Sequence, residues 1–294
     1  MKNSILFAGI ILLAASCSSE SDVTVSNPEV GRATVSVHVD NFTSEQEEFA
    51  SARGMTRASD ISSVTSIKAI TLAFYSGTTE VYKSTQFRAD DSNYTTFGAF
   101  STSLNVGSYT MVVIGYGGTS EITLTSPTSA SYASKALDTF VHTQTVNVNN
   151  TSDIDLSATL SRVVTRLKLQ TTDAMPEIVK KVSISISAGG LSFNPTTGLA
   201  TVNTGFTNEI TPSSGYGSTT SFSTYYFLAT DEQTMNVTIN VLDADDNVLF
   251  TKQVSNVPMK RNRTTTLSGK LFGADATATF TVDADWLTEH TVDF

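Results

Sequence analysis

The 294-residue sequence contains one cysteine, three histidines and one tryptophan. A single cysteine excludes an intramolecular disulfide and any metal cage that needs several thiolates. The three histidines, His38, His142 and His290, are far apart in the sequence, so no pair has the close spacing of a local metal-binding motif. We therefore expect neither a metal ion nor another cofactor.

Basic residues and helix-forming runs are also scarce. The chain has 18 lysines and arginines against 28 acidic residues, which gives a net charge of -10. Because binding to phosphate backbones depends on clustered cations, nucleic acid is not an expected partner. Thr, Ser, Val, Gly and Asn dominate the composition, and they favour strands and turns. The expected fold class is all-β.

No catalytic motif stands out in the sequence. It contains no Gly-x-Ser-x-Gly elbow, and the glycines within 115–118 lack the third glycine of a dinucleotide-binding loop. Residues 243–247 resemble the start of a calcium loop, but Val248 and Val254 occupy the positions that require Gly and Glu. We expect a hairpin turn there. We also expect that the protein is not an enzyme, although the sequence leaves open a catalytic pair of acidic residues that folding brings together.

Residues 1–17 have the layout of a lipoprotein signal peptide. Lys2 precedes the apolar run 5–13, and small residues lead to Cys17. The run is shorter than the roughly 20 residues that a membrane-spanning helix needs, so we predict removal of the peptide and lipidation of Cys17. The alternative is a secretory signal with an incidental cysteine. If Cys17 is lipidated, the polar segment 18–22 would tether the precursor to the outer membrane.

The clearest strand pattern lies shortly after this segment. Ala33, Val35, Val37 and Val39 alternate with polar residues, as in a strand with one buried face. The polar stretch 40–57 lacks this alternation and predicts an exposed loop.

Many short strands are expected in the remainder, with turn residues between them, and this favours a β-sandwich over a barrel. The length favours two domains, 58–160 and 161–294. Residues 129–140 also admit a short helix. The expected strands cover residues 67–75, 109–116, 153–160, 163–170, 182–187, 224–228, 235–242, 248–254 and 264–272.

The C-terminal segment nearly repeats the pattern of the first strand. Apolar residues again occupy every second position: Ala276, Ala278, Phe280 and Val282. The two segments are therefore candidates to occupy one groove in turn, and Trp286 begins a second short segment beyond. The alternative is an ordinary last strand that closes its own domain.

The order of these features resembles the fimbrillin family of Bacteroidetes type V pili, in particular its FimA-type stem subunits. The likeness rests on the lipobox and the first strand, and it extends over nearly the whole chain. It also includes three local motifs: Met55-Thr56-Arg57-Ala58, the segment Leu160–Leu167, and the segment Val257–Asn262.

The resemblance implies two transthyretin-like β-sandwich domains and cleavage by an arginine-specific protease in the loop after the first strand. The matching bond is Arg57–Ala58, with Arg53 and Arg32 as alternatives. Arg32 fits worse because it precedes the strand that cleavage should release. Residues 18–57 would be a propeptide, and the segment from Ala276 would be a donor strand. The lipidated outer-membrane precursor would become part of an extracellular fimbria, assembled from copies of itself and other fimbrial subunits.

Three other roles stay open at this point. A lipid-retained anchor of the same pilus should lack the protease site, and a tip subunit need not present a C-terminal donor. A surface glycan-binding lipoprotein would usually stack sugars on exposed aromatic rings. The one tryptophan, Trp286, is in the tail.

Overall fold

The computed structural model describes residues 31–43, 58–60, 64, 66–88, 97–273 and 281–283, and every regular element in them is a β-strand. The expected all-β class is therefore confirmed. The described residues belong to one compact unit that begins at Gly31. In this part of the chain, no helix has the length and apolar character needed to cross a membrane.

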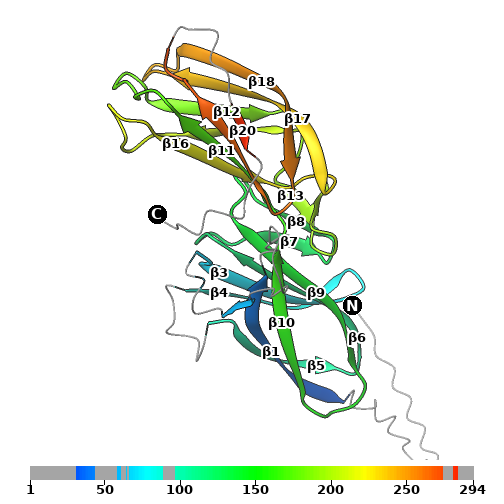
Figure 1. Cartoon of the computed structure of the whole chain (residues 1–294). Helices are drawn as coiled ribbons and strands as arrows, with labels where there is room; N and C mark the ends of the chain where they lie inside the picture. The colour runs from blue at the N-terminus through cyan, green and yellow to red at the C-terminus, as the bar shows by residue number, and fades with distance from the viewer. Residues whose placement is uncertain are drawn as a thin grey trace, which may run out of the picture. The chain divides into compact units, whose positions relative to one another are not determined.

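The largest sheet has eight strands and contains the N-terminal strand (Figure 1). Its order is β2-β1-β10-β9-β6-β3-β4, and β5 pairs with β1 outside that path. The strands are β1 (Arg32–Thr43), β2 (Ala58–Asp60), β3 (Ala69–Ser76), β4 (Thr79–Phe87), β5 (Ala99–Asn105), β6 (Gly107–Tyr116), β9 (Thr139–Val148) and β10 (Ile154–Arg162).

Two four-stranded sheets from the C-terminal part share one hydrophobic cluster, with Leu167 and Leu267 from one sheet and Ile184 and Val237 from the other. This is a sandwich arrangement. The first sheet contains β16 (Ser221–Tyr226), β11 (Thr165–Thr171), β19 (Thr264–Gly269) and β20 (Thr281–Asp283) in that order. The second contains β15 (Phe206–Ile210), β12 (Lys181–Ile186), β17 (Glu232–Leu242) and β18 (Val248–Lys260).

A small fourth sheet combines strands from before and after Leu160. Its order is β14 (Leu199–Ala200), β13 (Ser192–Asn194), β8 (Ser129–Ser131) and β7 (Thr123–Ser126). A third hydrophobic cluster accompanies it, in which the Phe193 and Phe227 rings stack with centroids 4.1 Å apart. Segments on both sides of Leu160 therefore share a core, and the division into domains 58–160 and 161–294 stays a prediction.

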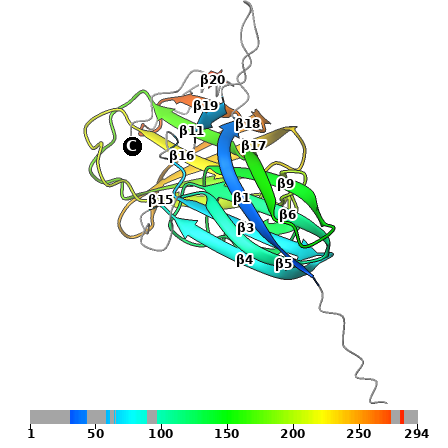
Figure 2. The ribbon, with the colours of Figure 1, turned by 90° about the horizontal axis from the view of Figure 1, so that it is seen from below.

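The first strand is longer than the sequence pattern predicts. Figure 2 shows β1 as one long strand, and it continues past Val39 to Thr43. The register on β10 shifts between Val39 and Asn41, and the pairing with β10 continues to Thr43. Residues 41–43 also pair with β2. The loop expected from Asp40 is therefore wrong for residues 40–43, while residues 44–57 lie outside the described part.

The helix expected over 129–140 is also wrong. Residues 129–131 form β8, and β9 begins at Thr139. The Tyr132 N–H donates to the Leu191 carbonyl oxygen at 3.0 Å, and Ala136 forms an isolated bridge with Tyr225. Pairing with distant segments outweighs the helix propensity of this alanine-containing stretch.

The expected hairpin at Asp243–Asn247 is confirmed. It joins β17 to β18, and Asp246 adopts a φ of 61°, in the left-handed region. One carboxylate oxygen of Asp243 accepts the N–H groups of Asp245 and Asn247, each at 2.9 Å. The hydrogen bond from the Asn247 side chain, followed by these two backbone hydrogen bonds, lowers the pKa of the Asp243 carboxyl. The aspartate therefore acts as a turn residue here.

Burial raises the pKa of several tyrosines, which predicts a cooperative alkaline transition. The pKa of Tyr75 rises to about 12, first through desolvation and then through the charge of Glu80. Burial also raises the pKa of Tyr116, Tyr132, Tyr225 and Tyr226.

Because these folded-state pKa values lie above the ordinary value of 10.0, the associated stability is fully present below pH 10 and is lost as the pH rises towards 12. In an alkaline titration, phenolate absorbance should rise together with the loss of the far-ultraviolet strand signal. Ionisation of all nine tyrosines near pH 10 in a chain that stays folded would contradict this expectation.

Candidate functional site

The N-terminal strand β1 lies inside the largest sheet and is paired along both edges. One edge pairs in parallel with β10 over Val35–Thr43. The other pairs antiparallel with β5 over Arg32–His38, and then with β2 over Asn41–Thr43. We call this position, between β10 on one side and β5 and β2 on the other, the β1 site. It is the candidate functional site because its occupant comes from the predicted propeptide.

The four residues predicted to form the buried face of the first strand all face the core. Their exposed fractions are at most 4%. They are Ala33, Val35, Val37 and Val39. Removing their apolar surface from water stabilises the chain by roughly 6 to 10 kcal/mol gross, an upper bound.

Apolar residues of the flanking strands pair with residues of this buried face. Val37 pairs with Leu156 on β10 and with Phe100 on β5, while Ala33 pairs with Leu104. All five residues belong to the same hydrophobic cluster or pack against it. Since directly paired residues point to one face of a sheet, only a strand with apolar residues at every second position completes this cluster.

Two polar side chains near the end of β4 position β5 and the segment before β3. The buried Gln86 donates through Nε2 to the Ala99 carbonyl oxygen at 2.6 Å and accepts the Gly98 N–H through Oε1 at 2.7 Å. The Arg88 Nε donates to the Ile67 carbonyl oxygen at 2.7 Å. Sequence reasoning missed both residues, because the polar sequence of β4 shows no alternation and gives no local signal of these contacts.

The predicted cleavage and donor segments are described only in part. Ala58 is the first residue of β2 and pairs with Thr43. Val282 lies in β20 and pairs with Leu267 of β19. In this arrangement β20 extends its own sheet, so it must leave β19 before it can act as a donor. The following residues lie outside the described part of the chain: Cys17, Arg53, Arg57, Ala276, Ala278, Phe280 and Trp286.

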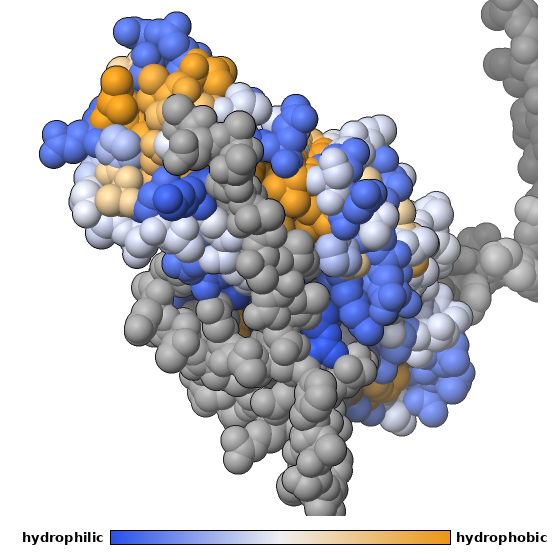
Figure 3. All heavy atoms as spheres, turned by 45° about the horizontal axis from the view of Figure 1, so that its top comes forward, coloured by the Kyte–Doolittle hydropathy of each residue, from blue (hydrophilic) through white to orange (hydrophobic). Residues whose placement is uncertain are grey.

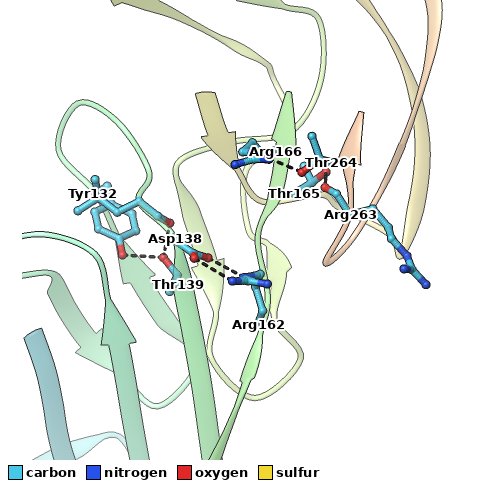
Figure 4. Close-up of polar contacts among 9 residues, drawn as sticks. Tyr132, Asp138, Thr139, Arg162, Thr165, Arg166, Arg263 and Thr264 are labelled. Carbon is cyan, nitrogen blue, oxygen red and sulfur yellow. Dashed lines mark hydrogen bonds and ion pairs between the residues drawn. The ribbon is translucent and has the colours of Figure 1, made fainter. Parts of the chain in front are cut away.

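Polar contacts cluster where β10 leads into β11 (Figure 4). The Arg162 Nε and Nη2 donate to the two carboxylate oxygens of Asp138 at 2.7 and 3.0 Å. The same guanidinium lies 4.5 Å from the centre of the Phe140 ring. Further along, the Arg166 Nε donates to Thr264 Oγ1 at 3.0 Å. The motif Leu160–Leu167 indicated this junction from the sequence, but the partner residues were not predictable from it.

Neither of the two histidines in the described part belongs to a group of side chains that could hold a metal ion. His38 is exposed on β1. The His142 ring nitrogens lie 3.1 Å from the Thr159 carbonyl oxygen and 3.3 Å from Gln144 Oε1. Among the described residues, no group of three or more His, Cys, Asp or Glu side chains is arranged to hold a metal ion.

Several solved structures have a similar fold. A candidate adhesin from Bacteroides ovatus matches with a TM-score of 0.51 and 10% identity, over 85% of this chain and 96% of that one. A second candidate adhesin from Bacteroides ovatus matches with a TM-score of 0.49 and 12% identity, over 83% of this chain and 88% of that one. The fimbrial anchor protein Mfa2 from Porphyromonas gingivalis matches with a TM-score of 0.47 and 14% identity, over 86% of this chain and 97% of that one. No curated protein matches the sequence. The first likeness shows a shared fold.

A protein-family model matches residues 119–294, which is more than half of the chain. The matched region begins after β6, so it includes β10 but neither β5 nor β2. Its description is a family of unknown function, DUF6562, and the chain belongs to that family.

Proposed function

We propose that the chain is a structural subunit of a cell-surface fimbria that polymerises by exchanging β1 for the C-terminal segment of another copy. The observation that carries this proposal is the position of β1, which is paired on both edges and reaches the rest of the chain through residues 44–57. Removing it would expose two strand edges and an apolar groove. Such edges pair readily with another chain.

In this proposal, maturation proceeds in two steps. Lipidation at Cys17 holds the precursor at the outer membrane, and an arginine-specific protease then cuts the Arg57–Ala58 bond. Because β2 begins at Ala58, a cut at Arg57 separates β1 while leaving every paired residue of β2 intact. A cut at Arg53 would also leave β2 intact, and we propose Arg57 because the predicted loop ends there, directly before β2. The mature subunit then joins copies of itself and other fimbrial subunits outside the cell.

The fold agrees with a structural role. The likeness to a candidate adhesin from Bacteroides ovatus is a likeness of fold, and adhesion by the assembled fimbria is part of the proposal. We propose no enzymatic activity and no cofactor. The glycan-binding alternative receives little support, because the exposed large apolar side chains of the described residues are all aliphatic. On the face shown in Figure 3, apolar side chains are interspersed with hydrophilic ones.

A second candidate role is that of a lipid-retained anchor or a tip subunit of the same pilus. It is favoured by the pairing of β20 with β19, since this pairing uses part of the predicted donor segment within its own sheet. The two roles differ in whether the C-terminal segment is required for assembly.

The proposal predicts that cleavage at one bond triggers polymerisation. The chain from Ser18 onward should be cut by an arginine-specific protease to give a new N-terminus at Ala58, followed by a ladder of multimers that resist denaturant on a gel. Arg57→Ala should abolish the ladder, whereas Arg53→Ala should leave it unchanged. N-terminal sequencing and gel electrophoresis measure both effects.

A truncation before Ala276 separates the two roles. Loss of the ladder in the truncated chain, with cleavage unaffected, supports the stem role. If the cut chain that keeps its C-terminal segment stays monomeric, the stem role is excluded and the anchor or tip role is left. A ladder that persists after truncation would show that another segment is the donor.

A further inference from the structure

We infer that β2, the first segment of the proposed mature chain, forms part of the acceptor site and pairs with the end of the incoming donor strand. This inference rests on the proposed function. It begins from the edge of β1 that faces away from β10, where β5 flanks the first half and β2 flanks residues 41–43. Within the described residues, β2 pairs only with β1. Departure of β1 would therefore leave β2 without a partner strand.

The C-terminal segment matches β1 in sequence at one register. Placing Ala276 at the level of Ala33 gives identical residues at four of the eight positions Ala33–Asp40. In that register Val282 and Asp283 coincide with Val39 and Asp40, where β1 changes its register on β10. A donor strand with the same Val-Asp pair at this point is suited to make the same register shift on β10 and to continue its pairing with β10.

The register also identifies the donor residues that would contact β2. Asn41, Phe42 and Thr43 pair with Asp60, Ser59 and Ala58 in the present structure. The positions of those three β1 residues correspond to residues 284–286 of the donor. The donor strand would therefore extend three residues beyond the alternating apolar part, and β2 would pair with that extension. This gives the residues from Ala58 a binding role in the polymer.

The test compares two donor peptides on the same cleaved chain. The full chain from Ser18, cut at Arg57 with β1 still present, is mixed with fluorescent peptides of residues 275–288 or 275–283, and displacement of β1 is measured at equilibrium. We expect the longer peptide to exchange about tenfold more favourably, the factor that one or two net backbone hydrogen bonds supply. The ratio of the two exchange constants is the readout, because the competing β1 and the competing C-terminal segments of other copies are the same in both.

Three variants locate that advantage on β2. The double variant Ser59→Pro/Asp60→Pro removes two successive N–H groups of β2. Because successive N–H groups of a strand point to opposite edges, one of the two faces the donor, and the ratio should fall to about one. Ser62→Pro, two residues after Asp60, should leave the ratio near ten. A long peptide carrying both Ala284→Pro and Asp285→Pro should behave like the short one for the same reason, and it leaves the folding of the acceptor unaltered. A ratio of one with the unmodified chain, or of ten with the double variant, overturns the role of β2 while the exchange of the short peptide still upholds the proposed function. Failure of both peptides to exchange overturns both.

Discussion

Replacing Val37 by aspartate should lower the free energy of unfolding by about 4 kcal/mol or more, because it places an unpaired carboxylate in the core. Val37 is fully buried and pairs with Leu156 and Phe100 on the two flanking strands. Neither neighbour offers a hydrogen bond from its side chain. Urea unfolding followed by circular dichroism measures the change.

The neighbouring substitution His38→Asp is the matched control. His38 is exposed on the opposite face of β1, so the same carboxylate there should change the stability by no more than about 0.5 kcal/mol. Equal midpoints for the two variants would show that the core closes without β1, which would remove the basis for the β1 site.

Replacing Phe227 by alanine is the second large expected effect, a loss of about 3 to 5 kcal/mol. Phe227 is fully buried, and its ring stacks on Phe193 at 4.1 Å and on Tyr132 at 6.2 Å between centroids. These rings come from both sides of Leu160. We therefore expect the substitution also to weaken the coupling between the two halves, so that calorimetry shows two transitions where the parent shows one.

Val248→Ala supplies the comparison for this variant. Val248 is 54% exposed at the start of β18, and its truncation should leave both the midpoint and the number of transitions unchanged. If Phe227→Ala gave a single transition at the parental midpoint, the shared core would have no role in joining the halves.

The sequence predicts the occupant of the candidate site better than the site itself. The alternation in Ala33–Val39 identifies a strand with one buried face because every second residue is apolar. Its partners are not predictable in this way. β10 lies more than a hundred residues further along the chain and pairs in parallel, and no local pattern specifies such a partner. The site depends on tertiary pairing, which periodicity does not encode.

Two of the strands that were not predicted, β4 and β5, lack a regular apolar alternation. β4 lies at the end of the largest sheet, and its residues Val81, Tyr82 and Phe87 are irregularly spaced among polar ones, so it has no period-two signal. In β5 the buried Phe100 and Leu104 are separated by the half-buried Thr102, which interrupts the apolar alternation. The lipidation and cleavage residues, Cys17 and Arg57, follow from motifs and stay predictions.

The parallel pairing of β1 with β10 also has a consequence for the order of folding. Pairing β1 with β10 closes a loop of more than a hundred residues, and the chain loses conformational entropy before any contact between the two strands compensates for it. The hairpins β3-β4 and β17-β18 need much shorter loops, so they should form earlier and β1 should insert late. A chain on its way to the native state would then pass through a form whose core lacks only this strand. That transient form would match the open conformation that the proposed polymerisation requires, so the folding intermediate and the proposed assembly-competent subunit would be one species reached from two directions.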